Sequence, residues 1–404
     1  MTSETQNAAD VHRSALVIDT HADTPQRFVD EGFDLAGPLD GGNLNLDSAR
    51  EGNLSAIFFA IFVEPARYKG RYAHRALELI DAVKLQAARH ADQVAFVSSP
   101  EGILTAQRAR KLAMLMGIEG GHSIEGSLAL LRQYYALGAR YMTLTWNNSN
   151  GWADSSGDMD DAAIPHTEDG LSDFGEQVIA EMNQLGMMVD VSHVSDRTFD
   201  RVLAISRAPV IASHSSARAL CNAPRNLTDD MIRAVANSGG PGSQGGVVMV
   251  NFYSGFLSQS YFDAQRAIQV EVNQAVEEMK KSAQAEGREA SAVEVDHLER
   301  AFYDRIPRPP FSLLIDHIDH IATVGGIDHL GLGSDFDGIF GQLPEEINSP
   351  ADLPRITAAL MARGYSAVDC RKLLGGNLLR VFREVEQMAY TARKTANAQD
   401  CESS

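Results

Sequence analysis

The sequence predicts a (β/α)8 barrel, in which eight parallel strands alternate with helices. Eight short apolar segments alternate along the chain with longer segments of helical period. Several of the short segments are almost entirely apolar, as expected for parallel strands that are covered on both faces. Histidine, aspartate and glutamate residues follow the C-terminal ends of most of these segments, which is the end where such barrels place their sites.

The eight predicted strands, in chain order, are residues 16–20, 54–63, 112–119, 140–146, 187–193, 209–214, 246–253 and 329–337. The clearest predicted helices are residues 73–91, 123–138, 171–186 and 195–207. Each of these helices separates two predicted strands, which is typical of parallel strands joined by helical crossovers. A doubly wound open sheet gives a similar alternation, but it gathers its site at one switch point rather than along nearly every strand end.

We expect residues 10–390 to form a single barrel domain. The chain has 404 residues, 44% of them hydrophobic, which is enough for one large core. A charged stretch at about 255–312 interrupts the pattern before the last strand, and its helical period predicts two exposed helices. We expect this insertion to cap the site, although a solvated excursion or a dimer contact fits the pattern too. Residues 391–404 are expected to form a polar C-terminal tail.

Charge and cysteine content argue against several classes of protein. The formal net charge is -19, whereas nucleic-acid binders need a basic surface. Cys221, Cys370 and Cys401 lie far apart and form neither a disulfide framework nor a zinc-knuckle spacing, as in a reducing compartment. The sequence has no apolar run of membrane-spanning length and no apolar signal-peptide core. We expect a cytoplasmic protein without nucleic-acid or membrane partners, although a periplasmic or secreted protein without its leader would look the same.

The residues at the predicted strand ends indicate a metal site. They are His21 and Asp23 after the first strand, Glu119 in the third, His193 in the fifth, His214 in the sixth, and Asp335 and Asp337 in the eighth. One such histidine alone is more often a hydrogen-bonded core residue. The strand ends of a barrel share one rim, however, and so many carboxylates there would repel one another without cations. Imidazole and carboxylate ligands suit zinc, and Glu119 is placed to bridge two ions that share a hydroxide.

Several segments resemble the renal (membrane) dipeptidase family of zinc metallopeptidases. They are IEGGHS (118–123), GLSDFGEQVIAEMNQLGMMVDVSHVSD (170–196), APVIASHSSARALCNAPRN (208–226), VMVNFY (248–253) and GLGSDFDG (331–338). The likeness runs from about Leu16 to the GGNLLRVF segment near residue 382. It implies a (β/α)8 barrel with two zinc ions that cleaves dipeptides, often with a D-residue at the C-terminal position, and that forms a homodimer.

The resemblance also implies the ligand set. His21 and Asp23 match the pair that binds the first zinc, and Glu119 matches the bridging carboxylate. His193 and His214 match the ligands of the second zinc.

Two more residues match family positions that act on the substrate, and a third is expected to line the substrate pocket. Asp335 matches the residue that takes a proton from the attacking water and passes it to the leaving amine. Arg225 matches the arginine that holds the C-terminal carboxylate of the substrate, and its planar guanidinium suits that task. Tyr253, at the end of the seventh strand, is expected to line the pocket together with Asn251.

One position departs from the family pattern. Well-known members end strand four in a histidine that binds the substrate and the oxyanion, whereas this chain has Trp146. Indole donates one hydrogen bond and has no useful acidity. Trp146 therefore donates that bond, or Asn147, Asn148 or His122 replaces it, or zinc alone polarises the substrate carbonyl.

Four further residues have weaker claims. We expect Asp337 to support the site or cap the following helix, and Asp190 to orient a histidine ligand or hold a strand end. His317 and His320 form an HxxH pattern, but without a catalytic glutamate beside it the pattern predicts a packed helix rather than a ligand pair.

Hydrolysis of dipeptides is the predicted function, with alternatives from two other classes. One is another binuclear amidohydrolase that acts on a different amide or ester. Many such barrels bridge their metals through a modified lysine at the end of strand four, and YMTLTWNNSN (141–150) contains none. The other is a non-catalytic metal-binding barrel, which Trp146 favours and the complete ligand set opposes. Metal content and a panel of dipeptides, lactones, hydantoins and phosphotriesters separate the three.

Overall fold

The structure is a computed structural model that describes the backbone of residues 7–402 and the side chains of residues 7–391. Its strands are β1 (Val17–Ala22), β2 (Leu54–Phe62), β3 (Val94–Phe96), β4 (Leu112–Glu119), β5 (Ala139–Thr143), β6 (Met188–Asp190), β7 (Ile211–Ala212), β8 (Val247–Val250) and β9 (Leu330–Leu332). All pairings between these strands are parallel. The ring runs β1, β2, β4, β5, β6, β7, β8, β9 and back to β1. The predicted (β/α)8 barrel is therefore confirmed.

Each of the eight predicted strand segments overlaps one barrel strand. The prediction missed β3, which pairs with the first residues of β4 through Val94 and Leu112. Only three residues long, β3 is too short to show a period. It lies at the start of β4 and leaves the later residues of β4 to pair with β5, so the ring of eight is unaffected.

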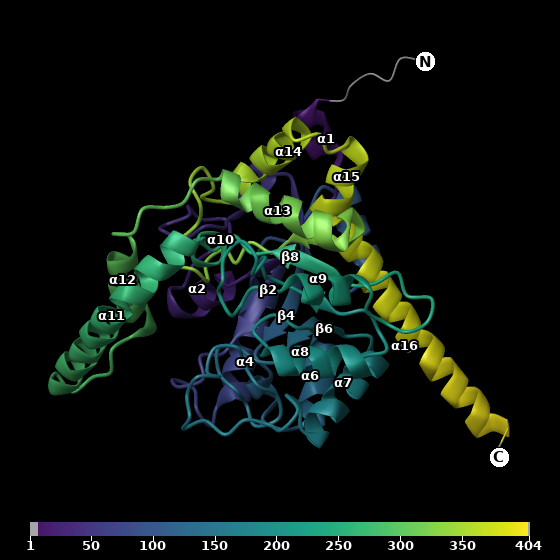
Figure 1. Ribbon diagram of the computed structural model, residues 1–404, viewed down its shortest axis with the longest axis horizontal. Helices are drawn as coiled ribbons and strands as arrows, with labels where there is room; N and C mark the ends of the chain where they lie inside the picture. Colours follow the sequence, from purple (N-terminus) through teal and green to yellow (C-terminus); the bar gives the residue numbers. More distant parts are fainter. Residues whose placement is uncertain (1–6, 403–404) are drawn as a thin grey trace.

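Helices surround the barrel (Figure 1). They are α1 (Ala8–Ser14), α2 (Thr24–Asp30), α3 (Leu46–Glu51), α4 (Tyr72–Arg89), α5 (Pro100–Arg108), α6 (Leu128–Leu137), α7 (Asp173–Leu185), α8 (Asp196–Ile205), α9 (Asp229–Ala236), α10 (Ser254–Leu257), α11 (Gln259–Ala285), α12 (Ala292–Tyr303), α13 (Ser312–Gly325), α14 (Leu353–Ala362), α15 (Ala367–Arg371) and α16 (Asn377–Glu402). Short 3-10 turns span Gly121–Ile124, Ile327–His329 and Pro350–Asp352, and a π-helical turn spans Lys372–Gly376.

One predicted helix begins later than expected. The pattern predicted a helix over residues 123–138, but α6 begins at Leu128. Glu125 and Gly126 have φ angles of 50° and 67°, which lie in the left-handed region and end the preceding 3-10 turn. The hydroxyl of Ser127 then accepts a hydrogen bond from the backbone N–H of Leu130 and caps the new helix.

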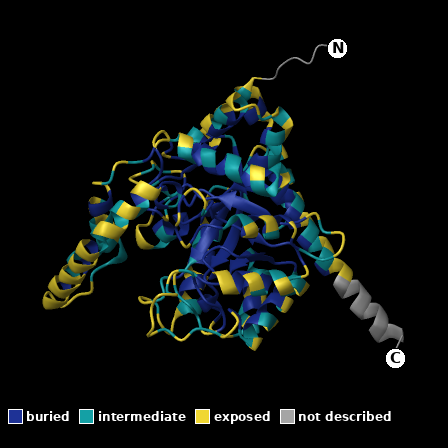
Figure 2. Cartoon of the chain, in the orientation of Figure 1, coloured by how far each residue is buried: buried dark blue, intermediate teal, exposed yellow. Residues whose placement is uncertain are grey.

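The barrel interior is filled by alternate residues of the strands. On β2, Ala56 and Phe58 face inward, and the Phe58 ring lies 5.6 Å from the ring of Tyr141 and 6.3 Å from that of Phe382, between centroids. Phe382 belongs to α16, whose first turns pack into the interior cluster, so this helix closes one end of the barrel. Figure 2 shows the strands as the most deeply buried part of the molecule. Because side chains alternate along a strand, the face that carries Leu115 also carries Glu119.

The insertion at 255–312 contains α10, α11 and α12, of which α11 and α12 pack side by side and project from the barrel (Figure 1). Val272, Val276, Phe302 and Tyr303 form a small apolar cluster between them. The last residues of α11 and the turn that follows them, residues 284–289, are exposed (Figure 2), as expected for the tip of a charged amphipathic pair.

Two further features concern the ends and the surface. Helix α16 continues to Glu402, through the segment expected to be a polar tail; the side chains of residues 392–404, including that of Cys401, lie outside the described residues. Among the residues that the structure describes, no helix combines the length and the apolar character that crossing a bilayer requires.

Candidate metal centre

Five predicted ligands meet at the mouth of the barrel around Glu119. One oxygen of its carboxylate, Oε2, lies 3.2 Å from Nε2 of His21. The same nitrogen of His21 lies 3.5 Å from Oδ2 of Asp23. The other oxygen, Oε1, lies 3.0 Å from Nε2 of His193 and 3.7 Å from Nε2 of His214. Glu119 therefore presents one oxygen to each of two ligand pairs, which is the arrangement a bridging carboxylate needs.

Hydrogen bonds on the far side of two histidine rings fix their tautomers. The hydroxyl of Tyr141 donates to the carbonyl of Thr20 at 3.0 Å, so it accepts from Nδ1–H of His21, also at 3.0 Å. The Nδ1–H of His193 donates to Oδ1 of Asn147 at 3.0 Å. In its neutral form each ring thus turns an unprotonated Nε2 toward Glu119, as metal-binding histidines do.

The third ring follows the same pattern and creates a conflict that a cation resolves. Nδ1 of His214 lies 2.7 Å from Oγ of Ser213, and its Nε2 lies only 2.9 Å from Nε2 of His193. Two nitrogen lone pairs this close repel each other unless they share a proton or a positive ion. The buried Nε2 of His21 also has no hydrogen-bond partner among the described residues. These donors fit bound metal ions of the zinc type.

The electrostatics of the pocket favour positive charge as well. Burial, reinforced by the charge of Glu119, raises the pKa of Asp23 to about 8. Burial also lowers the pKa of His193 to about 3, with the charge of Arg225 acting in the same direction. Burial would lower the pKa of His21, but Tyr141 and Glu119 raise it well above its ordinary value. The His21 side of the site therefore stabilises a positive charge beside two crowded carboxylates.

Asp335 lies on the His21 side of the centre. One oxygen of Asp335, one of Asp23 and a nitrogen of His21 lie within 4.8 Å of one another. The amide nitrogen of Asn251 donates to Oδ2 of Asp335 at 2.9 Å and fixes the carboxylate. Asp335 and His193 have φ angles of 65° and 67°, so both site residues occupy the left-handed region that ordinary residues avoid. Backbone strain of this kind is found at functional sites.

Arg225 places a buried positive charge beside the second ligand pair. Its guanidinium donates to Oγ of Ser215 at 3.3 Å and to the carbonyl of His214 at 3.1 Å. Its Nε is buried without a partner, and within residues 7–391 no carboxylate pairs with it. Burial lowers its pKa to about 10, so the group remains charged at neutral pH. A buried, unpaired guanidinium is suited to an anionic ligand.

A sequence profile described as membrane dipeptidase (peptidase family M19) matches residues 5–396. The chain belongs to the membrane dipeptidase family. Dipeptidase 3 of Mus musculus is 35% identical over 348 residues, which are 86% of this chain and 59% of the relative. Dipeptidase 3 of Homo sapiens is 33% identical over 387 residues, covering 94% and 67%. The chain thus spans about three fifths of the mouse relative's length.

Solved structures agree with this family membership. A probable dipeptidase, PvdM from Pseudomonas aeruginosa, superposes with a TM-score of 0.78 at 27% identity and covers 94% of this chain and 98% of its own. A metallopeptidase from Rhodobacter sphaeroides, liganded with a phosphinate mimic of the dipeptide L-Ala-D-Ala, gives 0.68 at 23% identity over 92% and 99%, which is a likeness of fold. The metal-binding cluster around Glu119 therefore lies in a chain of a metallopeptidase family.

The sequence predicts that Trp146 stands where the family pattern has a histidine. Its half-buried ring lies 4.7 Å from the ring of Phe62 and 6.4 Å from that of His193, between centroids. His122 cannot take over as a neutral donor, because its Nε2–H already donates to the carbonyl of Val63 at 2.7 Å. Its pKa is lowered by burial, so it stays neutral and its free Nδ1 is only an acceptor.

Tyr253, the other residue expected to contact substrate, faces the insertion. Its hydroxyl donates to Oε1 of Gln265 on α11, and its backbone N–H donates to Oδ1 of Asn251 at 2.6 Å. Through Asn251 it is connected to Asp335. Arg300 on α12 donates to the carbonyl of Gly41 at 2.9 Å, so the insertion contacts the rim loops at two places.

Asp337 connects two loops instead of facing the ligands. Its carboxylate accepts hydrogen bonds from the backbone of Asn43 and the hydroxyl of Thr24, each at 2.6 Å. The HxxH histidines also have structural partners. His317 accepts from the backbone N–H of Ala217 and donates to a carbonyl on α10, while His320 lies 2.7 Å from a carboxylate oxygen of Asp229.

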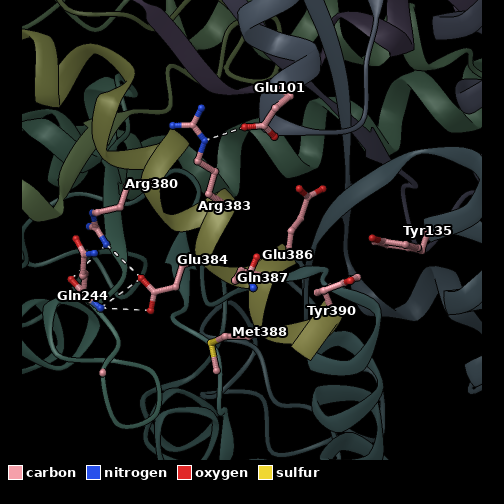
Figure 3. A pocket seen from close by; sticks show the side chains of 11 residues that line it. Glu101, Tyr135, Gln244, Arg380, Arg383, Glu384, Glu386, Gln387, Met388 and Tyr390 are labelled. Atoms are coloured by element: carbon pink, nitrogen blue, oxygen red, sulfur yellow. Dashed lines mark hydrogen bonds and ion pairs between the residues drawn. The ribbon is translucent and has the colours of Figure 1, made fainter. Parts of the chain in front are cut away.

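A hollow of about 890 Å³ lies beside α16 and shares no residue with the metal centre (Figure 3). Two of its arginines have carboxylate partners there: Arg383 donates to Glu101 at 3.0 Å, and Arg380 lies 3.9 Å from Glu384.

The supports of the histidines are what the sequence reasoning missed. The sequence pattern does not indicate Tyr141 or Ser213, and it indicates Asn147 only as a donor to the substrate. Tyr141 lies two residues before the end of β5, and Ser213 directly precedes His214. A polar residue on the inward face of a strand beside a ligand strand is the signal that would have found them.

Proposed function

We propose that this chain is a dipeptidase that uses two zinc ions bridged by Glu119. The observation that carries the proposal is the division of its ligands: Oε2 of Glu119 faces His21 and Asp23, while Oε1 faces His193 and His214. When bound, zinc would acidify a water molecule and polarise the carbonyl of the scissile peptide bond.

Asp335 would handle the proton of this reaction. It lies on the His21 side of the centre, and burial raises its pKa, which makes the carboxylate a stronger base than an exposed aspartate. With Oδ2 held by Asn251, its other oxygen is available to take the proton of the attacking water and give it to the leaving amine.

Arg225 would select substrates that end next to the scissile bond. Its buried guanidinium donates a hydrogen bond to the backbone carbonyl of His214, which is a member of the second ligand pair. It lacks an anionic partner within the described residues. A free C-terminal carboxylate would complete it with two charge-assisted hydrogen bonds. Longer peptides cannot place a carboxylate there and should be rejected. We infer both L-Xaa-L-Xaa and L-Xaa-D-Xaa dipeptides as substrates, and Trp146 as a residue that shapes the choice among them.

The deciding experiment is turnover of purified protein of known metal content against a library of these dipeptides. The same protein after chelation and after zinc is restored provides the control, and lactones, hydantoins and phosphotriesters test the other amidohydrolase reactions. We expect cleavage that disappears on chelation and returns with about two zinc ions per chain. Two bound zinc ions without cleavage of any dipeptide would overturn the substrate, and the absence of bound metal would overturn the mechanism. The homodimer, the cytoplasmic location and the capping role of the insertion stay predictions.

A further inference from the structure

Asp190 lies beneath the second ligand pair and is completely buried at the end of β6. Its Oδ1 accepts hydrogen bonds from the backbone N–H groups of Ser192 at 3.0 Å and Ser213 at 2.8 Å. Its Oδ2 accepts from the hydroxyls of Thr143 at 2.5 Å and Ser213 at 2.6 Å. Four donors surround this carboxylate, and no cationic side chain among the described residues pairs with it.

The hydroxyl of Ser213 connects this carboxylate to a metal ligand. It lies 2.6 Å from Oδ2 of Asp190 and 2.7 Å from Nδ1 of His214. A hydroxyl has a single proton, and an ionised carboxylate can only accept. The Ser213 proton therefore goes to Asp190, and Oγ of Ser213 accepts the proton of Nδ1 of His214. The Nε2 of His214 is then left with a free lone pair toward Glu119.

We propose that Asp190 is a positioning residue that fixes the tautomer of His214 through Ser213 and thereby determines how tightly the second zinc ion binds. The proposal rests on the proposed two-metal site. This role differs from holding two strand ends together. The tautomer of His214 depends on whether the atom of residue 190 that faces Ser213 accepts or donates a hydrogen bond.

The substitution Asp190→Asn makes this dependence testable. The backbone N–H groups of Ser192 and Ser213 require an oxygen in the place of Oδ1, so the new NH2 group takes the place of Oδ2. It would donate to Ser213, whose hydroxyl would then donate to Nδ1 of His214. The proton of the imidazole would move to Nε2 and block the lone pair. Asparagine in place of such an aspartate gives the wrong histidine tautomer in serine proteases.

Two measurements follow the change: the 15N spectrum of labelled histidine in metal-free protein, and zinc affinity by competition with a chromophoric chelator. For His214 we expect Nδ1–H in the wild type and Nε2–H in Asp190→Asn. We expect one of the two zinc ions to bind about 10–100-fold more weakly in the variant, the usual cost of losing such a support. An unchanged tautomer with unchanged zinc affinity would overturn the proposal.

A matched pair separates this role from packing, also if Asp190→Asn does not fold. Ser213→Ala and Thr143→Val each remove one hydroxyl from Oδ2 of Asp190, and both positions are fully buried. Only Ser213 contacts His214. Ser213→Ala should lower the affinity for one of the two zinc ions, and Thr143→Val should leave the affinity for both unchanged. An equal loss of zinc affinity in the two variants would show a structural role and overturn the inference. If the wild type binds no zinc, the proposed function fails, and the tautomer spectra still decide the role of Asp190.

Discussion

Buried histidines occur in two regions of this molecule, and their ring nitrogens differ. In the helical shell, both nitrogens of each buried ring are hydrogen-bonded. His12 contacts Oγ1 of Thr357 at 2.7 Å and the carbonyl of Gly52 at 2.8 Å, and His317 is bonded equally completely. At the barrel mouth, His21 and its two partners have one bonded nitrogen each, and the other faces Glu119.

This difference separates the predicted ligand histidines from His12 and His317 better than burial or spacing does, whereas His122 also has one free nitrogen and is not a predicted ligand. The HxxH pattern of His317 and His320 looks like a metal motif in the sequence, yet His317 is a core residue with satisfied nitrogens. A metal ligand must keep one nitrogen unprotonated and unshared, which is costly for a buried polar atom unless a cation completes it. The comparison predicts that changes at the mouth alter metal binding and turnover, whereas changes in the shell alter stability.

The largest effect is expected for Glu119→Gln. The substitution keeps the shape of the side chain but removes the charge that faces both ligand pairs. Both zinc ions should be lost and turnover with them. The measurement is zinc per chain after gel filtration, together with dipeptide cleavage. Glu125→Gln, on the exposed turn six residues later, is the control and should keep both. Retention of two zinc ions by Glu119→Gln would remove it from the bridging position.

Asp335→Asn should lower kcat by about 10²–10⁴-fold, the usual contribution of a general acid-base, while both zinc ions are retained. Asp337→Asn is a demanding control, because Asp337 lies two residues away with the same φ angle of 65°. Its carboxylate binds Thr24 and Asn43, so its loss should lower the unfolding temperature and leave kcat nearly unchanged. Near-normal kcat in Asp335→Asn would exclude it from the proton transfer.

Arg225→Met should raise KM about 100-fold for dipeptides with a free C-terminus, because it removes a bidentate, charge-assisted contact worth about 3 kcal/mol. Steady-state kinetics on a dipeptide and on its C-terminal amide provide the measurement. Arg218→Met is the matched control, since Arg218 lies in the same loop and pairs with Asp196 at 2.7 Å. If Arg225→Met raised KM for the C-terminal amide by the same factor, the guanidinium would not be the partner of the substrate carboxylate.

The sequence predicted the barrel and the gathering of the candidate ligand residues at one rim, because both depend on periodic or repeated features. Apolar strand segments that end in His or Asp place those side chains on one rim, whatever the details of the loops. It could not predict the supports. Tyr141 contacts His21, which is distant in the sequence, and Ser213 contacts the adjacent residue His214. Nothing in their own segments indicates which ring they face. The three-residue β3 and the later start of α6 at Leu128 depend on single backbone conformations, which patterns do not encode.

The smallest effect concerns the shell and is read from the pH dependence of stability. Burial lowers the pKa of His317 to about 4 from its ordinary 6.5, because the ring is enclosed and its Nδ1 is used as an acceptor. As the pH falls, the unfolded chain therefore binds the proton first. The stability that this neutral ring contributes is fully present above about pH 6.5 and is lost as the pH falls toward 4.

Between pH 7 and pH 5 the loss should be about 2 kcal/mol of unfolding free energy. His317→Gln lowers stability at pH 7 but cannot take up the proton, so its free energy of unfolding should fall by that much less over the same range. Urea unfolding of both metal-free proteins gives the slopes without a contribution from zinc release. Equal slopes would mean that His317 titrates normally in the folded chain. The shell histidines would then be no better satisfied than those at the mouth, and the comparison between the two regions would lose its physical basis.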